Sequence, residues 1–249
     1  MMMLSVVDVI SIPVVGIATG FFGTQGYVYC SAPTLMYYLG CIIALTWIFH
    51  SCIALLLAIN RCLSVHHANL TARLFDGNKP YYWAIPAFLY GMYFAIYTRV
   101  PFFTGIGFSW FFDPHFGYLK TLDTRYYSYQ HAYHNMTICF GTIFVYTMFF
   151  IVMCRNWNRT GRQQTDTQKS VFLQVFLISL CTCGATATYV VMNFEFAPAI
   201  LTVVSSFTYF GIHGVPPLIY LLLNDTIRKR IHRIIRKGDS KTTAVPPTV

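Results

Sequence analysis

The residue in this sequence that is best placed to take part in chemistry is a carboxylate inside an apolar run. Asp8 follows Leu4-Ser5-Val6-Val7 and precedes another stretch without charge. An ionised carboxylate at the centre of a bilayer costs roughly 2.5 to 3.5 kcal/mol, so it should face the interior of a helix bundle. There it could meet sodium or a hydroxyl group. If Asp8 lies at the membrane surface instead, it is only a solvated charge.

The remaining reactive side chains do not form a recognisable catalytic or metal-binding pattern. His131 and His134 have the i, i+3 spacing that could chelate a metal, but no carboxylate or cysteine lies near them, which favours interfacial polar residues. The eight cysteines lack zinc-ligand spacing, and no paired carboxylates or Ser-His pair stand out. We therefore expect no enzyme activity, no metal and no cofactor.

Two further positions lie near the ends of apolar runs. Arg61 ends Leu56-Leu57-Ala58-Ile59-Asn60, where the helix dipole and a snorkelling side chain would favour a cation without any further role. Pro217 lies deep in the last apolar run, three residues before Tyr220. A proline there frees a backbone carbonyl and bends the helix, either as a hinge or as a passive kink.

Composition indicates that these positions are set in membrane helices. Of the 249 residues, 56% are apolar and only 10% are charged, whereas soluble domains have about a quarter charged residues. The mean hydropathy of +0.53 and the 18% aromatic content fit a lipid-facing bundle. The net charge of +9 comes from basic residues between apolar blocks and in the tail, which favours a membrane surface over nucleic acid as partner.

The apolar runs predict an all-α, polytopic bundle over residues 1–223 with about six crossings, because one crossing needs about 20 apolar residues. We place the spans near residues 1–22, 34–59, 81–98, 133–154, 170–193 and 197–223. The first is the weakest, since it contains Asp8 and Pro13 and begins at the initiator Met with no leader before it.

Basic residues predict the orientation of the bundle. Fourteen of the 17 Lys and Arg residues lie in alternate loops and in the tail, on the side that the positive-inside rule makes cytoplasmic. The carboxyl terminus is then cytoplasmic, and six crossings put the amino terminus on the same side. The opposite loop, 101–130, is rich in Phe, Trp and Tyr, which could roof a pocket or form an interfacial belt.

The chain after residue 223 predicts a membrane-surface anchor. Residues 224–237 read as a short amphipathic helix with isoleucines on one face, and residues 238–249 as a disordered cytoplasmic tail. The polar face consists of basic residues that should contact anionic membrane lipids: Arg228, Lys229, Arg230, Arg233, Arg236 and Lys237.

The order of these motifs resembles a seven-helix receptor. The strings Leu57-Ala58-Ile59-Asn60-Arg61-Cys62 and Leu223-Asn224-Asp225-Thr226-Ile227-Arg228, with Pro217-Leu218-Ile219-Tyr220 between them, resemble the nematode serpentine chemoreceptors of class T (Srt) over nearly the whole chain. The resemblance implies that the second span matches the receptor's third helix and that the receptor's first helix is absent.

The resemblance also implies a function and its residues. Arg61, Asn60, Pro217 and Tyr220 would form the switch that faces a heterotrimeric G protein, a small molecule would be the ligand, and the plasma membrane of sensory cells the location. Two departures stand out. Asn60 replaces the usual acidic residue, and Cys30 has no cysteine partner between positions 100 and 132, which puts the receptor family's disulfide in doubt.

Three functional interpretations remain open. The first is a G-protein-coupled chemosensory receptor. The second is a truncated or inactive product of such a receptor gene, because removing one helix exposes packing faces to lipid. The third is a six-helix transporter or channel, which is weakened because only Asp8 and Glu195 offer charge near membrane depth.

Overall fold

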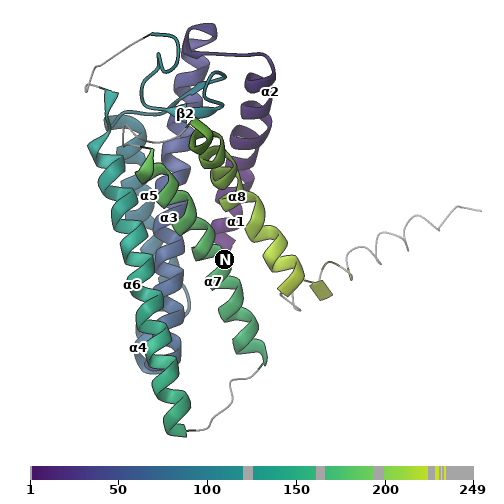
Figure 1. Cartoon of the computed structure of the whole chain (residues 1–249). Coiled ribbons are helices and arrows are strands. Elements are labelled where there is room, and N and C mark those ends of the chain that lie inside the picture. The colour runs from purple at the N-terminus through teal and green to yellow at the C-terminus, as the bar shows by residue number, and fades with distance from the viewer. Residues whose placement is uncertain are drawn as a thin grey trace, which may run out of the picture.

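The chain forms a bundle of long helices with a small β-hairpin inserted at one end (Figure 1). This computed structural model describes residues 2–119, 126–160, 166–192 and 199–223, together with 228, 229, 231 and 233. In chain order the elements are α1 (Met2–Ile12), the π-helix η1 (Pro13–Ala18), α2 (Thr19–Thr24), the 3-10 helix η2 (Tyr29–Ser31), α3 (Pro33–His66), α4 (Ala68–Phe75), α5 (Lys79–Tyr97), β1 (Phe102–Thr104), β2 (Ser109–Phe111), α6 (Tyr129–Thr160), α7 (Asp166–Val191) and α8 (Ala199–Leu223).

The prediction of a polytopic helical bundle is confirmed. Among the described residues, five stretches of helix are long and apolar enough to cross a membrane: Met2–Thr24, Pro33–Ser64, Tyr129–Val152, Leu173–Val191 and Ile200–Leu223. The predicted span 81–98 falls on α5, which begins with Lys79-Pro80-Tyr81-Tyr82-Trp83 and is not one of these five. Its crossing stays a prediction.

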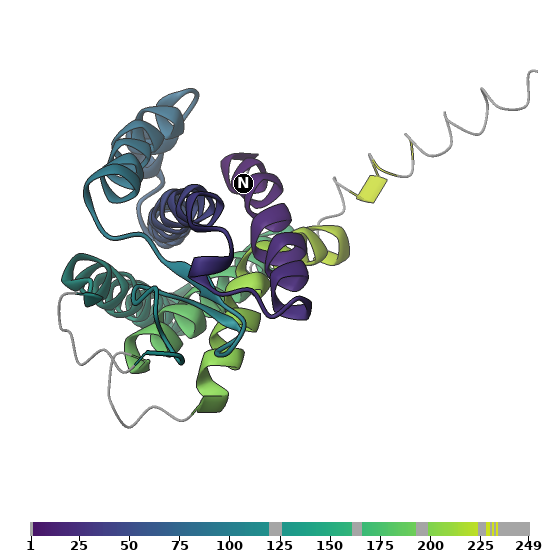
Figure 2. The same ribbon diagram turned by 90° about the horizontal axis from the view of Figure 1, so that it is seen from above.

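Helix α3 is the central element of the bundle. It packs against α1, α5, α6 and α7, and the view along the bundle shows it enclosed by them (Figure 2). Its 34 residues extend roughly 51 Å, more than one crossing needs. Arg61, expected at the end of the span, is therefore followed by more than a turn of helix before α4 begins.

The first apolar span is a single rod made of three segments. Pro13 lacks a backbone N–H and cannot continue the α-helical hydrogen-bond pattern, and the turn that follows it widens into the π-helix η1. The carbonyl oxygen of Val14 accepts from the backbone N–H of Thr19 and also from its hydroxyl, at 3.0 Å, which keeps the widened turn hydrogen-bonded. The chain therefore passes Pro13 without breaking the rod.

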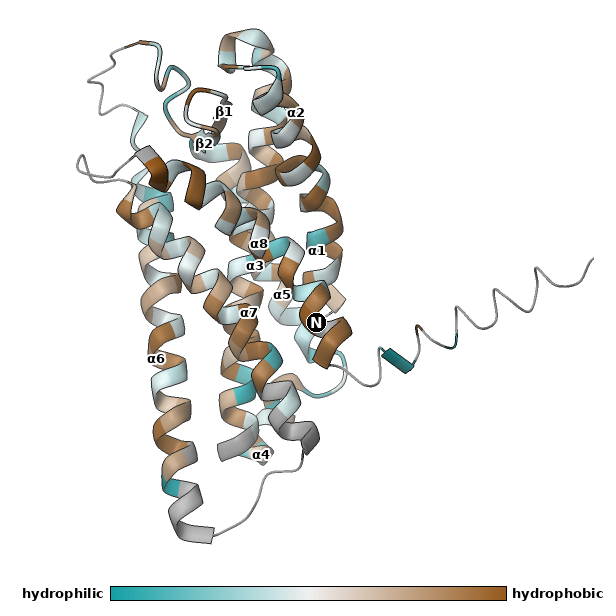
Figure 3. Ribbon diagram, turned by 45° about the vertical axis from the view of Figure 1, so that its right-hand side comes forward, coloured by the Kyte–Doolittle hydropathy of each residue, from teal (hydrophilic) through white to brown (hydrophobic). Residues whose placement is uncertain are grey.

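Many large apolar side chains lie on the outside of the bundle, and several polar side chains lie among the apolar ones inside it. Val9, Ile17 and Phe140 each keep about 70% of their surface exposed (72%, 72% and 69%), whereas Gln174 and Thr186 are buried. The ribbon is brown, the colour of hydrophobic residues, along much of the length of the helices in Figure 3. Large apolar side chains along the outside of the helices are what a lipid environment requires.

The β-hairpin closes one end of the bundle, which we call the hairpin end; the opposite end is the α4 end. Strands β1 and β2 pair antiparallel, with Phe103 opposite Trp110, and both side chains are buried. Trp110 Nε1 donates to Thr19 Oγ1 at 3.0 Å, and Ser206 Oγ of α8 donates to the Phe108 carbonyl at 2.8 Å. The aromatic loop therefore forms a roof at these positions, rather than an interfacial belt.

Candidate functional site

A buried polar cluster lies at the middle of the bundle, where α1, α3 and α8 meet. Asp8, His50 and His213 contribute one side chain each, and none is more than 1% exposed. His213 Nδ1 lies 2.9 Å from Asp8 Oδ1, His50 Nε2 lies 3.7 Å from the same oxygen, and the two imidazole rings are 4.9 Å apart. We call these three residues the triad.

The triad has more polar atoms than partners. Asp8 Oδ2, both ring nitrogens of His50 and His213 Nε2 are buried without a hydrogen bond. Ser11, one turn after Asp8 on the same face of α1, also has a buried hydroxyl without a partner. Buried polar groups normally have hydrogen-bond partners, so a cluster of buried polar atoms without partners indicates a candidate binding site.

Sequence reasoning identified Asp8 but missed His50 and His213. The structure places Asp8 inside the bundle, so the solvated-surface interpretation does not apply to it. The signal for the histidines was present, because each lies within a long run free of charged residues, where an ionisable side chain normally faces the interior. The sequence did not show how the three helices are shifted along one another, and this shift places the three side chains at the same depth in the bundle.

An aromatic chamber of about 50 Å³ lies between the triad and the hairpin. It is lined by four helices and the hairpin: Ile43, Ala44 and Trp47 of α3, His131 and Asn135 of α6, Tyr189 of α7, Tyr209 of α8, and Pro101, Trp110 and Phe112. Trp47 is its central side chain. It donates to Asn135 Oδ1 at 2.9 Å and contacts the rings of Tyr189 and Tyr209.

The chamber and the triad are connected by ring contacts. The Tyr209 ring lies 5.4 Å from Trp47 and 5.5 Å from His213, which lies one turn further along α8. His213 in turn contacts His50 and Asp8. A displacement of Trp47 therefore reaches the triad through a single intervening side chain.

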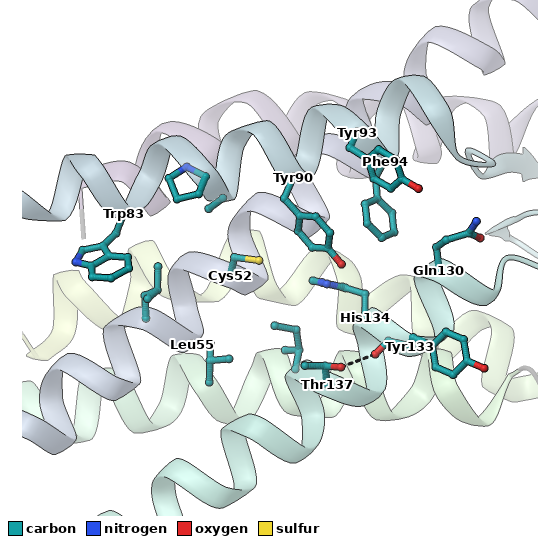
Figure 4. A pocket seen from close by; sticks show the side chains of 14 residues that line it. Cys52, Leu55, Trp83, Tyr90, Tyr93, Phe94, Gln130, Tyr133, His134 and Thr137 are labelled. Carbon is teal, nitrogen blue, oxygen red and sulfur yellow. Dashed lines mark hydrogen bonds between the residues drawn. The ribbon is translucent and has the colours of Figure 1, made fainter.

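A separate groove of about 590 Å³ lies between α3, α5 and α6 (Figure 4). Its walls are mostly apolar, with Tyr90 and Phe94 of α5 facing His134 of α6. Phe94 contacts both the His134 ring, at 5.8 Å, and the His131 ring, at 4.6 Å. Because His131 lines the chamber and His134 lines the groove, Phe94 and the two histidines form the wall between them.

His131 and His134 are each 5% exposed and lie inside the bundle, so the interpretation of them as interfacial polar residues is wrong. His134 Nε2 lies 2.8 Å from Ser51 Oγ of α3, and that contact joins α3 to α6. His131 instead faces the chamber, where its ring contacts Phe112 at 4.8 Å. The two histidines therefore line two different cavities, His131 the chamber and His134 the groove.

The residues predicted to face a G protein lie toward the α4 end. Arg61 is three turns beyond His50 on α3, whereas Pro217 is only one turn beyond His213 on α8. Measured from the triad, Arg61 therefore lies roughly 10 Å further along the bundle than Pro217. Arg61 and Asn60 are partly exposed. Pro217 is exposed, whereas the adjacent Pro216 is buried. The side chain of Tyr220 lies outside the described residues.

Two polar side chains of α7 hold the carboxyl end of α8. Ser170 Oγ donates to the Leu223 carbonyl at 2.5 Å, and Gln174 Nε2 donates to the same oxygen at 3.0 Å. Both bonds run from α7 to the last described carbonyl of α8 and so join the two helices. Sequence reasoning did not identify this contact, which we call the α7–α8 clasp.

Replacing Gln174 by Leu should loosen the α7–α8 clasp. Removing a hydrogen bond of about 1 kcal/mol should raise amide exchange in the last turn of α8 by roughly fivefold, without affecting α3. Hydrogen–deuterium exchange of the detergent-solubilised chain measures this. Thr182→Val is the matched control, because that buried α7 hydroxyl donates only to the carbonyl of Ile178 in its own helix. Equal exchange in both variants would contradict the role assigned to Gln174.

Only part of the predicted basic anchor lies within the described residues. Arg228, Lys229 and Arg233 are described and exposed, and Arg228 Nη1 donates to the Leu222 carbonyl at 3.4 Å. Arg230, Arg236, Lys237 and the tail 238–249 lie outside the described residues. The amphipathic helix stays a prediction.

Cys30 forms no disulfide, and all eight cysteines are free thiols. Its Sγ lies 3.6 Å from the phenol oxygen of Tyr118, which itself donates to the Pro114 carbonyl at 2.9 Å. Burial raises the pKa of Tyr118, and its contact with Cys30 raises it further. The phenol therefore stays neutral and acts as a donor that orders the loop after β2.

Comparison with known proteins decides the family. The family model described as "Serpentine type 7TM GPCR chemoreceptor Srt" matches residues 1–244. The chain belongs to the Srt family. This Srt chain is also 26% identical over 232 residues to serpentine receptor class T-55 of Caenorhabditis elegans. No solved structure matches it.

Membership confirms the resemblance read from the motifs. The Srt family is a receptor family of the G-protein-coupled type, and the Srt chain is accordingly a multi-pass membrane protein. The match to receptor T-55 covers 92% of this chain but only 63% of that receptor. The Srt chain therefore spans about three fifths of the length of the curated relative that it matches.

Proposed function

We propose that this chain is a chemosensory receptor that binds a small molecule in the aromatic chamber and activates a heterotrimeric G protein from the α4 end. Family membership supports the receptor class. The observation that carries the proposal is the chamber itself, because one molecule there would touch α3, α6, α7 and α8 together. A ligand changes a conformational equilibrium only through contacts that differ between states, and four helices offer such contacts.

The chamber limits the class of ligand. Its volume of about 50 Å³ corresponds to a few water molecules, at ~10–15 Å³ for each. Its wall is aromatic and aliphatic, and its polar groups are few: the phenols, His131 and Asn135. The ligand that fits without rearrangement has only a few non-hydrogen atoms, is mostly apolar, and has one or two polar atoms.

The orientation follows from the same proposal. The hairpin end faces outside and the α4 end, with the carboxyl terminus, faces the cytoplasm. The exposed cations Arg73, Lys79, Arg228 and Lys229 support this, since cytoplasmic loops retain basic residues. The plasma membrane of a sensory cell is the location that a receptor for external molecules requires.

Arg61→Ala tests the coupling step. The full chain is expressed in cultured cells with a promiscuous Gα subunit and exposed to a panel of small volatile compounds, while G-protein activation and surface expression are recorded. We expect activation that Arg61→Ala abolishes at unchanged surface expression. Arg73→Ala is the control, because it removes an exposed cation from the adjacent helix α4 and should retain activation.

Two outcomes count against the proposal. Activation that survives in Arg61→Ala would remove Arg61 from the coupling step. A chain that reaches the surface but activates no G protein with any compound would favour the inactive-product interpretation for this sequence.

A further inference from the structure

The triad combines three donor groups that are typical of a transition-metal site. One carboxylate and two imidazoles offer one ligand atom each, and these atoms all lie within 4.8 Å of one another. Zinc binds imidazole nitrogen and carboxylate oxygen at about 2.0–2.1 Å, which in a tetrahedral site separates ligand atoms by roughly 3.3 Å. Two of the observed separations, 2.9 and 3.7 Å, bracket that value.

The unsatisfied atoms of the triad are the second observation that points to a ligand. His50 is completely buried, yet neither of its ring nitrogens has a hydrogen-bond partner. A histidine that only stabilised Asp8 would donate to it, but His50 Nε2 stands 3.7 Å from the nearer oxygen, beyond hydrogen-bond distance. A cation between the two would satisfy both groups.

We propose that Asp8, His50 and His213 bind a divalent transition-metal ion, with zinc as the best fit. Imidazole favours zinc and its neighbours in the first transition row over sodium, calcium or magnesium, which prefer oxygen ligands. Three protein ligands leave a fourth position open. Ser11, on the same face of α1 as Asp8, has a buried hydroxyl without a partner that is available for that position or for a bound water.

Such an ion would join three helices that are distant in the sequence. It would fix α1, α3 and α8 at the level of His213, whose ring contacts the chamber residue Tyr209. Occupancy would therefore stabilise the packing beside the chamber. The inference does not rest on the proposed receptor function, because metal binding is measured without ligand or G protein.

Zinc binding to the purified chain tests the inference. The full chain, solubilised in detergent and stripped with a chelator, is titrated with zinc chloride, and bound zinc is counted after gel filtration. We expect one ion per chain and a higher melting temperature with zinc. Asp8→Asn, His50→Asn and His213→Asn should each weaken binding by at least ~10- to 100-fold, the loss typical of even an outer residue of a metal site.

His131→Asn is the matched control for these variants. It removes another buried histidine with an unpartnered Nε2 from the same bundle, outside the triad, and should leave zinc binding unchanged. Zinc binding that none of the three triad variants weakens would overturn the inference. So would an Asp8-dependent stabilisation by sodium chloride with no effect of zinc.

X-ray absorption of the zinc-loaded wild-type chain keeps the test decisive even if a triad variant fails to fold. The spectrum should show two imidazole nitrogens and further oxygen ligands at about 2.0–2.1 Å. Sulfur ligands, or fewer than two imidazoles, would place the metal elsewhere and overturn the inference.

Discussion

Trp47→Ala should be the most destabilising single truncation in the hairpin half of the bundle. The Trp47 side chain is 5% exposed and is the common contact of α6, α7 and α8 at the chamber. Its removal should cost on the order of 3 kcal/mol through the cavity left behind. It also leaves Oδ1 of Asn135, a residue only 6% exposed, without its N–H donor. We expect a large loss of surface expression and of melting temperature in detergent.

Tyr38→Ala is the control for that truncation. Tyr38 is an aromatic residue of the same helix but is 62% exposed on the outside of the bundle, so its removal opens no internal cavity. Melting temperatures that fall equally for the two variants would show that the Trp47 position is not special.

The polar part of the Trp47 contact can be isolated. Trp47→Phe keeps an aromatic ring but removes the N–H donor, which should cost about 0.6–2 kcal/mol because Asn135 is left unsatisfied. Adding Asn135→Leu removes the orphaned group and should recover part of the loss. A double variant that loses the sum of the two single effects would show that the two side chains are not coupled.

Gly40→Ala should displace the hairpin from the bundle. A Cβ atom at Gly40 would lie 2.2 Å from the carbonyl oxygen of Pro101, and this oxygen belongs to backbone that leads directly into β1. Neither partner can move without shifting α3 or the hairpin. We expect a loss of about 1–3 kcal/mol from overpacking and a lower melting temperature.

Gly20→Ala is the matched control and should have the opposite sign. Gly20 lies within α2, and a Cβ atom there meets nothing within 4 Å. Replacing a helical glycine by alanine at an open position stabilises by roughly 0.5–1 kcal/mol. If Gly40→Ala is as stable as Gly20→Ala, the close approach of α3 to Pro101 does not limit the packing.

These predictions share one physical feature of the bundle. Helices in lipid gain little from burying apolar surface, since the lipid tails are equally apolar, so close packing and internal hydrogen bonds decide which helices associate. Trp47 supplies both in the hairpin half, and Gly40 allows the close approach. The α7–α8 clasp has the same role toward the α4 end, where Gln174 joins α7 to the end of α8.

The sequence by itself determined that this protein lies in a membrane, that it is helical, and which family it belongs to. Hydropathy, charge content and short motifs such as Asn60-Arg61-Cys62 are local properties that need no knowledge of contacts. The same local reasoning found Asp8, because a charge in an apolar run is conspicuous. It also left open whether the aromatic loop 101–130 forms a roof or a belt, since both have the same composition.

Only the tertiary structure decided which side chains meet. His50 lies 42 residues from Asp8 and His213 lies 205 residues from it, and the turns between helices set the register that makes them level. The burial of Trp110, which lies on β2 and donates to Thr19 of α2, depends on the same long-range packing. No periodicity in a single helix encodes the depth of its neighbour, so the triad and the chamber became visible only when the helices were assembled.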